Sequence, residues 1–298
     1  MRLPTGEQFS SGQAYLLLHI MILFPNAKIN LGLEILNKRA DGYHNISTVM
    51  VPVGWHDVLE IVPSATNKTT LKVYGRKVEC PPEKNLVMRA YNALCDYTGG
   101  LPNVDFYLEK VIPDGAGLGG GSADAAFALR GLNELFNLGM PQEILAEIAS
   151  KIGADCAFFI YNRPALCEGI GDILTFDISP DLEGKSILIV KPHVASVSTR
   201  EAYAGVTPHP SEFNLPQIVS SEVGIWIDNL HNDFENSIFP KIPELKTLKQ
   251  SLFDKGAEYA SMTGSGSAIY GIFDSDKLAL NVADSFSDCD KIVTKAII

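Results

Sequence analysis

Apolar and polar residues alternate strictly from residue 27 onward, which is the pattern of a strand with one buried face. The pattern predicts that the apolar residues point one way and the polar residues between them point the other. The apolar set is Ala27, Ile29, Leu31, Leu33 and Ile35, and the polar set is Lys28, Asn30, Gly32 and Glu34. Strand-like runs at 46–53, 58–62, 71–74 and 104–110 make the early part of the chain β-rich.

Helical periodicity then appears in three segments. Apolar residues four apart predict a helix over 83–97. After a glycine-rich stretch, Ser122 is a suitable N-cap for a helix whose apolar stripe stops near Gly139. A third helix is predicted from Pro141 to Ile152, and the apolar runs 158–161 and 173–178 are predicted to be strands.

The turn-forming residues 180–184 are the best candidate for a domain boundary. Beyond them the pattern predicts a strand at 186–191, helices at 199–203 and 244–256, and a strand, a glycine-rich turn and a strand over 258–273. Residues 207–230 are punctuated by proline and weakly patterned. We therefore expect an α+β (two-layer α/β) fold with two domains, residues 21–179 and 180–298.

Composition narrows the classes of function. The chain has 298 residues, 46% of them apolar, and a net charge of −11, which is typical of a globular protein and excludes disorder and coiled coil. An acidic chain without a basic run is a poor general binder of nucleic acid or of an anionic membrane, so any anionic ligand must be held by local devices. The five cysteines lack zinc spacing and suit reduced core thiols in a cytoplasm.

The N-terminus carries an apolar run over residues 15–24. It is shorter than the about 20 residues that cross a bilayer, and neither a cationic start nor a signal-peptide cleavage site accompanies it. Because Met21 directly precedes the first strong pattern, we expect residues 1–20 to be an extension that is not part of the fold, and we expect no membrane association.

The glycine-rich stretch between the strand at 104–110 and the next helix has the chemistry of an anion cradle. Its residues are Pro113, Asp114, Gly115, Ala116, Gly117, Leu118, Gly119, Gly120, Gly121, Ser122 and Ala123. Glycines permit left-handed turns in which backbone N–H groups converge, and the following helix adds the positive end of its dipole. The stretch lacks the lysine of a P-loop, and a tight strand-to-helix connection is the simpler alternative.

Two charged residues elsewhere form a candidate catalytic pair. Lys28 lies on the polar face of its strand, and Asp155 follows a predicted helix. Taken singly, a solvated lysine and a turn-capping aspartate are the commoner interpretations. Together, a carboxylate and an ammonium would keep a kinase base ionised and aimed at an alcohol while the cation stabilises the moving phosphoryl group.

Aromatic residues and a second glycine-rich turn complete the candidate chemistry. Tyr43 and His44 follow a polar loop, and Tyr203 could supply the opposite face of a stacking site for a nucleobase. Residues 262–268, Met-Thr-Gly-Ser-Gly-Ser-Ala, form a turn between two predicted strands. This turn could be a simple hairpin, although two such turns favour a shared polyanionic ligand.

In this order, the segments 25–31, 113–126 and 262–268 resemble the three motifs of the GHMP kinase superfamily. Within it, they are similar to the kinases that act on a diphosphocytidyl alcohol in the non-mevalonate isoprenoid pathway. The distinguishing matches are Lys28–Asn30, 39–44, 85–87, the triple glycine before Ser122, 153–155, 197–203 and 232–235. Ala123 stands where a second serine is common, residues 1–20 have no counterpart, and residues 204–230 match weakly.

The resemblance implies a two-domain fold with the active site between the domains, and ATP-dependent, Mg²⁺-assisted phosphorylation of a small-molecule alcohol. It implies that Asp155 is the general base, that Lys28 is its charged partner, and that residues 113–123 hold the triphosphate of ATP, with Asn85 near the adenine. Asn30, Tyr43, His44 and Tyr203 would hold the cytidine diphosphate half of the substrate, with the base between Tyr43 and Tyr203.

Two alternatives stay open at this point. The chain could be another small-molecule GHMP kinase that acts on mevalonate, homoserine or a sugar, and the segment 41–44 would discriminate because a Tyr-His pair suits a cytidine ligand. It could also be a nucleotide-binding relative without activity, against which the presence of both Lys28 and Asp155 argues. The sequence does not indicate the oligomeric state.

Overall fold

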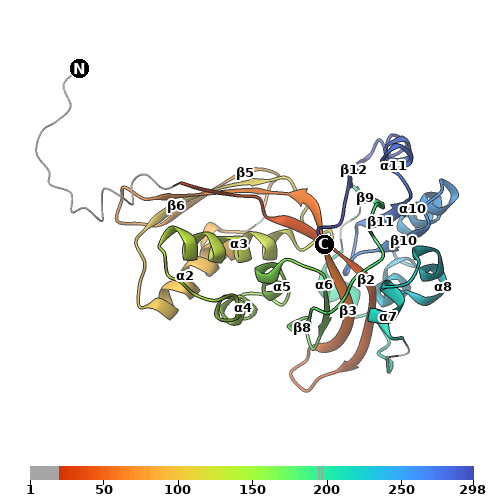
Figure 1. The fold of residues 1–298 in the computed structure, drawn as a ribbon, viewed down its shortest axis with the longest axis horizontal. Helices are drawn as coiled ribbons and strands as arrows, with labels where there is room; N and C mark the ends of the chain where they lie inside the picture. The colour runs from red at the N-terminus through yellow and green to blue at the C-terminus, as the bar shows by residue number, and fades with distance from the viewer. Residues whose placement is uncertain (1–19, 79, 194, 196, 212) are drawn as a thin grey trace, which may run out of the picture.

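The structure is a computed structural model that describes residues 20–298 except 79, 194, 196 and 212. Its named strands form three four-stranded sheets, and helices cover them on several sides (Figure 1). The expected extension at residues 1–20 lies outside the described residues except for its last position. The α+β architecture predicted from the sequence is confirmed.

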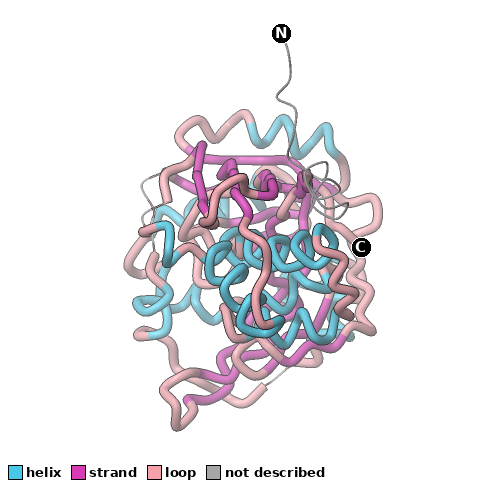
Figure 2. The backbone as a smooth tube through the Cα atoms, turned by 90° about the vertical axis from the view of Figure 1, so that its left-hand side faces the viewer, coloured by secondary structure: helices cyan, strands magenta, loops and turns pink. Residues whose placement is uncertain are grey.

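The first sheet has the strand order β1 (Met21–Leu23), β4 (Val58–Pro63), β6 (Val104–Lys110) and β5 (Thr70–Gly75), and only β5 and β6 run parallel. Helices α2 (Leu86–Thr98) and α3 (Gly120–Leu135) pack on one face of it, with α4 (Gln142–Ser150) and α5 (Cys156–Tyr161) beyond them (Figure 1). Figure 2 views this end of the molecule and shows the helices gathered on one side of the strands. The short helix η1 (Pro82–Lys84) precedes α2.

The second sheet has the order β2 (Asn26–Lys38), β3 (His44–His56), β7 (Ala165–Glu168) and β8 (Ile173–Thr175), all antiparallel. The prediction of a single buried face on β2 is wrong in two respects. Lys28 and Asn30 are buried on the face that was expected to be polar. A bulge at Gly32, whose φ is +66°, also shifts the register, so Leu31 and Leu33 belong to different cores.

The third sheet has the order β10 (Tyr259–Met262), β11 (Ile269–Phe273), β9 (Ser186–Pro192) and β12 (Cys289–Thr294), all antiparallel. Its central strand β9 is buried on both faces, which explains the unbroken apolar run Ile187 to Val190. Helices α10 (Pro243–Asp254) and α11 (Asp276–Ala283) cover one face, and the second sheet lies against the other.

In the described part of the chain between β9 and α10, the structure has five short helices. They are α6 (Thr199–Tyr203), α7 (Leu215–Val219), η2 (Val223–Ile225), α8 (Trp226–Asn229) and α9 (Asp233–Ile238). Three of them lie in the segment 207–230 that the sequence pattern leaves undecided. These short helices pack on the rest of the protein through single large side chains. One of these is the fully buried Trp226, which packs edge-on to Tyr259.

Two of the predicted strands require correction. Residues 158–161 belong to helix α5, because a short run in which every residue is buried has no periodicity that separates helix from strand. The strand predicted at 173–178 ends at Thr175, where β8 stops pairing with β7. None of the helices in the described part of the chain is long and apolar enough to cross a membrane.

Candidate active site

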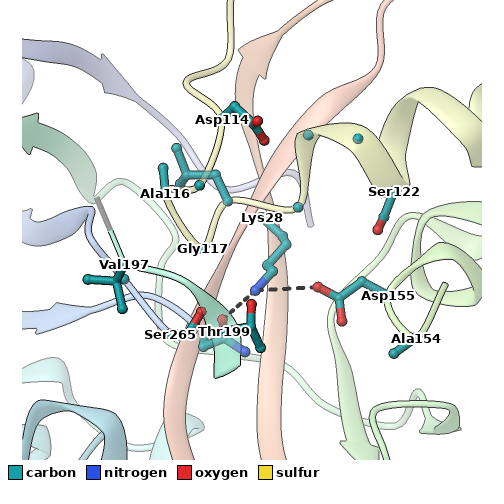
Figure 3. A pocket seen from close by; sticks show the side chains of 18 of the residues that line it. Lys28, Asp114, Ala116, Gly117, Ser122, Ala154, Asp155, Val197, Thr199 and Ser265 are labelled. Atoms are coloured by element: carbon teal, nitrogen blue, oxygen red, sulfur yellow. Dashed lines mark hydrogen bonds and ion pairs between the residues drawn. The ribbon is translucent and has the colours of Figure 1, made fainter. Parts of the chain in front are cut away.

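A cavity of about 400 Å³ lies where the three sheets and helix α3 meet. Lys28 from β2, Asp155 before α5, the loop between β6 and α3, and the turn between β10 and β11 all line it. The three motif segments 25–31, 113–126 and 262–268 therefore meet at one cavity, together with Asp155. Figure 3 shows Lys28 and Asp155 pointing toward one another, with Ser265 and Val197 on the other side of Lys28.

Lys28 is a buried cation at the floor of this cavity. Its side chain is 4% exposed, and its ammonium lies 3.7 Å from the Asp155 carboxylate. It also donates a 2.6 Å hydrogen bond to Asn30 Oδ1. Burial lowers the pKa of Lys28, and the nearby Asp155 carboxylate opposes that shift. Lys28 is therefore a buried residue that lines the cavity, and the simpler interpretation of a solvated surface lysine is wrong.

Asp155 occupies the N-cap position of α5 but makes no side-chain cap hydrogen bond. Its side chain is 28% exposed and lines the cavity. The carboxylate is consequently available to a ligand on one side while Lys28 holds it on the other. This arrangement has the geometry of a general base that is oriented by a neighbouring cation.

The loop between β6 and α3 has the backbone of an anion cradle. Gly115, Gly117 and Gly119 have φ angles of +60°, +74° and +73°, which L side chains rarely adopt. Gly119 is the N-cap of α3, and the helix begins at Gly120. The prediction of Ser122 as N-cap is therefore wrong: the N-cap lies three residues earlier, and Ser122 lines the cavity from the first turn of the helix. The positive end of the 16-residue α3 faces the cavity.

Hydrogen bonds join the three glycine-rich and polar segments to one another. Lys28 N donates to Leu118 O at 2.9 Å, and Ala268 N donates to Ala116 O at 3.1 Å. Thr263 Oγ1 lies 3.2 Å from Gly117 O. A Cβ atom on Gly117 would stand 2.0 Å from Thr263 O, so only glycine permits this approach. The cradle is thus held against β2 and against the turn of residues 262–268.

The turn between β10 and β11 faces the same cavity as the cradle, as the sequence suggested. Gly264, Ser265 and Gly266 line the cavity. Asn232, the N-cap of α9, donates hydrogen bonds from its amide to Met262 O at 2.7 Å and Gly264 O at 2.9 Å. This side chain, which the sequence motif flagged without a role, holds the turn in place.

Asn30 is engaged within the protein on both sides of its amide. Its Oδ1 accepts from Lys28 Nζ and lies 3.2 Å from Thr263 Oγ1, and its Nδ2 donates to Thr48 Oγ1 at 3.0 Å. The side chain is buried, with 2% of the residue exposed. In this structure the Asn30 side chain positions Lys28. A substrate that also contacts Asn30 would share its amide with Lys28, Thr48 and Thr263.

The aromatic residues are arranged differently from the expected sandwich. The His44 ring stacks on the Tyr203 ring at 4.9 Å between centroids and 18° between planes, and Phe234 packs edge-on to Tyr203. Tyr203 lines the cavity. Tyr43 is 62% exposed and is not among the cavity-lining residues. The structure thus brings His44 and Tyr203 together, while Tyr43 stays at the loop tip.

Asn85 lines a smaller cavity of about 200 Å³ that shares Leu86, Lys110, Asp114 and Gly121 with the first. Its Oδ1 caps α2 by accepting from Val87 N at 2.9 Å. The smaller cavity therefore continues from the anion cradle toward α2.

Matches to known protein families decide the class. The model of the GHMP kinases N-terminal domain matches residues 85–163, and that of the GHMP kinases C-terminal domain matches residues 215–291. The chain belongs to the GHMP kinase family. The fold is accordingly the two-domain GHMP kinase fold, as the motifs implied.

Curated relatives resemble this GHMP kinase along most of its length. A protein of Bacteroides thetaiotaomicron is 50% identical over 256 residues, which cover 85% of this chain and 92% of the relative. One of Bacteroides fragilis is 49% identical over 255 residues with the same coverage, and one of Parabacteroides distasonis is 46% identical over 269 residues, 90% of this chain and 97% of the relative. All three are named 4-diphosphocytidyl-2-C-methyl-D-erythritol kinase.

Solved structures resemble the GHMP kinase too. A crystal structure of 4-(cytidine 5'-diphospho)-2C-methyl-D-erythritol kinase superposes with a TM-score of 0.78 at 29% identity, covering 92% of this chain and 99% of that one. A homoserine kinase from Cytophaga hutchinsonii superposes with a TM-score of 0.70 at 19% identity, covering 91% and 97%. The second likeness concerns the fold alone.

The structure adds residues to this kinase's site that sequence reasoning missed. Lys110 lines both cavities and pairs with two buried carboxylates, Asp57 and Asp124. A signal was present: Lys110 continues the inward-facing alternation Val104, Phe106, Leu108, so a charge there had to be buried. Leu33, Ile46, Val197 and Thr199 also line the larger cavity.

Two cysteines lie near the catalytic pair but keep their protons. Burial raises the pKa of Cys156 to about 12 and raises that of Cys167 further. All five cysteines are free. The expectation of small core residues holds for Cys156 and Cys167, which are buried, and is wrong for Cys80, which is exposed; Cys95 and Cys289 are half-buried.

Proposed function

We propose that this GHMP kinase transfers the γ-phosphoryl group of ATP to the 2-hydroxyl of 4-diphosphocytidyl-2-C-methyl-D-erythritol. The observation that carries the proposal is the Lys28–Asp155 pair, 3.7 Å apart in a cavity that an anion cradle also lines. The names of relatives at 46–50% identity supply the alcohol, and the sequence motifs resemble those of the kinases of the non-mevalonate isoprenoid pathway.

In the proposed reaction, Asp155 accepts the proton of the substrate's 2-hydroxyl as its oxygen attacks the γ-phosphorus. A new O–P bond forms, the bond between the γ-phosphorus and the β,γ-bridging oxygen breaks, and ADP leaves with the electron pair. Lys28 orients the Asp155 carboxylate through their ion pair and stabilises negative charge on the moving group. The chemistry therefore rests on positioning and electrostatics.

The triphosphate is proposed to lie on residues 113–123, with its charge directed at the N-terminus of α3. The nucleoside then extends into the smaller cavity beside Asn85. The cytidine diphosphate half of the substrate is proposed to lie on the opposite side, near Asn30, His44 and Tyr203, with Tyr43 as an outer contact. The His44 and Tyr203 rings stack on each other, so each has one face covered by the other ring. In this arrangement the nucleobase would stack on the opposite face of one of these two rings.

A magnesium ion bound to the nucleotide is compatible with the residues present. No group of three or more His, Cys, Asp or Glu side chains could hold a metal within the part of the chain that the structure describes. Mg²⁺ does not need such a group of three protein ligands, because it is commonly held by one or two carboxylates together with substrate phosphates and water. Asp114 and Asp155 are the carboxylates that line the cavity and would hold it. Bound there, the ion neutralises phosphate charge.

A coupled assay of ADP release tests the proposal. The enzyme is supplied with ATP and Mg²⁺ and with one of three alcohols: the diphosphocytidyl methylerythritol, mevalonate or homoserine. We expect turnover with the first and background rates with the other two. Turnover with mevalonate or homoserine alone would assign another branch of the family, and no turnover with any alcohol despite nucleotide binding would favour a relative without activity.

A further inference from the structure

A buried charge cluster lies beneath the anion cradle and takes no part in the reaction proposed above. It consists of Lys110 at the end of β6, Asp57 between β3 and β4, and Asp124 in α3. Lys110 Nζ donates to Asp124 Oδ2 at 2.7 Å and to Asp57 Oδ2. The three side chains are 6%, 0% and 4% exposed. Charged groups this deeply buried need a complete set of partners.

The two carboxylates differ in how well they are satisfied. Asp57 accepts from Lys110 and also from Val111 N at 2.6 Å and Ile112 N at 2.8 Å. Among the described residues, Asp124 accepts a hydrogen bond from Lys110 through Oδ2, and its buried Oδ1 has no hydrogen-bond partner. Asp124 is therefore the carboxylate whose ionised form is least well supported.

The electrostatics agree with this difference. Burial raises the pKa of Asp124 to about 7, with the attraction of Lys110 opposing the shift and the repulsion of Asp57 adding to it. Near neutral pH the cluster thus exists in two forms. With both carboxylates ionised, its charge is −1, from one cation and two anions; with Asp124 protonated, the charge is zero.

The cluster lies directly against the backbone that receives the phosphates. A Cβ on Gly120, the first residue of α3, would be 3.4 Å from Lys110 Nζ. Lys110 lines the larger cavity together with the cradle, and Lys110 and Asp124 line the smaller one with Gly121. A negative charge at this depth repels a polyanion above it, because the protein interior screens charges weakly.

We propose that Asp124 takes up one proton from solvent when a nucleoside triphosphate binds to the cradle, so that nucleotide affinity and protonation of the cluster are linked. The proposal rests on the proposed function in that it takes residues 113–123 as the triphosphate site. By linkage, the form that binds the polyanion better is the neutral one, and affinity must fall as pH rises through the pKa of Asp124.

Other charged groups do not reverse this sign. Lys84 and Asp114, which also line the smaller cavity, are exposed, carry opposite charges and are screened by water. Cys80, beside them, is an exposed thiol. Asp57 accepts hydrogen bonds from the backbone N–H groups of Val111 and Ile112, just before the cradle, and these bonds are the same whether or not a nucleotide is bound above them.

Titration calorimetry of ATP binding in buffers of different ionisation enthalpy measures the proton directly. At about pH 8, where free Asp124 is mostly ionised, we expect the wild type to take up a fraction of a proton beyond that seen with Asp124→Asn. Subtracting the variant removes protons that belong to ATP itself. Glu258→Gln is the matched control, since Lys185 pairs there with Glu258 and Asp274 in a cluster of the same composition that does not line the cavity.

The outcomes separate the inference from the proposed function. Equal proton uptake in wild type and Asp124→Asn overturns the inference while ATP binding stands. Absence of ATP binding in the wild type overturns the assignment of the cradle itself. If Asp124→Asn does not fold, the wild type decides at a pH where ATP itself no longer titrates: its dissociation constant for ATP should rise between about pH 7.5 and pH 9, and a dissociation constant that stays flat over that range rejects the linkage.

Discussion

The ammonium of Lys28 lies 3.7 Å from the carboxylate of Asp155, although one belongs to the second strand and the other precedes the fifth helix. The two charged side chains are positioned by different kinds of contact. Lys28 is fixed by Asn30, which is itself fixed by Thr48 and Thr263. Asp155 is fixed by its backbone at the start of α5 and keeps one side open to the cavity. A buried ammonium thus faces a carboxylate that is accessible from the cavity.

Replacing the base tests this division of roles. Asp155→Asn keeps the shape but cannot accept the proton of an alcohol, so we expect kcat to fall about a hundredfold to ten-thousandfold. The melting temperature should change little because the side chain is partly exposed and makes no cap hydrogen bond. Steady-state kinetics and thermal unfolding check both expectations, and a variant with near-normal kcat would remove Asp155 from the role of base.

The pH dependence of kcat should reveal Lys28. Burial lowers the pKa of Lys28 below the ordinary value of 10.5, so its charge is present at low pH and is lost as pH rises through the lowered pKa. We expect kcat to fall on the alkaline side in the wild type. Lys28→Ala should have a low kcat at every pH and lack that alkaline fall. An alkaline fall that persists unchanged in the variant would belong to another group.

Sequence patterns predicted the motifs and their order because each motif is a matter of local backbone chemistry. Five glycines before a helix, or a lysine in a strand, are visible without the fold. What the patterns missed depends on register and depth. The bulge at Gly32 redirects Leu33 and Ile35, and no alternation rule anticipates it.

The partners of buried polar groups were also not visible in the sequence. Asn30 was expected to bind a substrate, and no sequence pattern showed that its amide also bonds to Lys28, Thr48 and Thr263. The stacking partner of Tyr203 is likewise set by how β3 and α6 meet, and His44 rather than Tyr43 lies there. These contacts form only when the strands and helices pack together, so the spacing of residues along the chain does not predict them.

The contact between the two glycine-rich turns makes Gly117 irreplaceable. Alanine there combines a φ of +74° with a Cβ 2.0 Å from Thr263 O. We expect Gly117→Ala to lower the free energy of unfolding by more than the about 1–2 kcal/mol of left-handed strain alone, and to raise KM for ATP. Gly139→Ala is the control, since φ there is +63° and its Cβ would meet nothing within 4 Å. Equal losses in a denaturant titration would refute the contact.

Asn232 should stabilise the turn of residues 262–268 through its two hydrogen bonds. Asn232→Ala leaves the Met262 and Gly264 carbonyls without these donors, so we expect a loss of about 1–3 kcal/mol in the free energy of unfolding. The turn also faces the cavity, and kcat/KM should fall with it. Asn229→Ala, which removes one hydrogen bond to Ile225 O at the surface, should cost less in both measurements. A kcat/KM unchanged from wild type in Asn232→Ala would disconnect the turn from catalysis.

Tyr203 offers the sharpest test of nucleobase stacking, because its ring and its hydroxyl can be separated. Burial, with the Asp155 charge adding to it, raises the pKa of Tyr203 to about 12, so the hydroxyl stays neutral through the working pH range. Tyr203→Phe keeps the ring and should leave KM for the cytidine substrate close to that of the wild type. Tyr203→Ala removes a stacking face worth about 1–3 kcal/mol, which corresponds to roughly a 5- to 150-fold rise in KM. KM for ATP, which binds on the other side of the cavity in the proposed arrangement, should change little in either variant. If the phenylalanine variant loses as much as the alanine variant, the hydroxyl rather than the ring makes the contact.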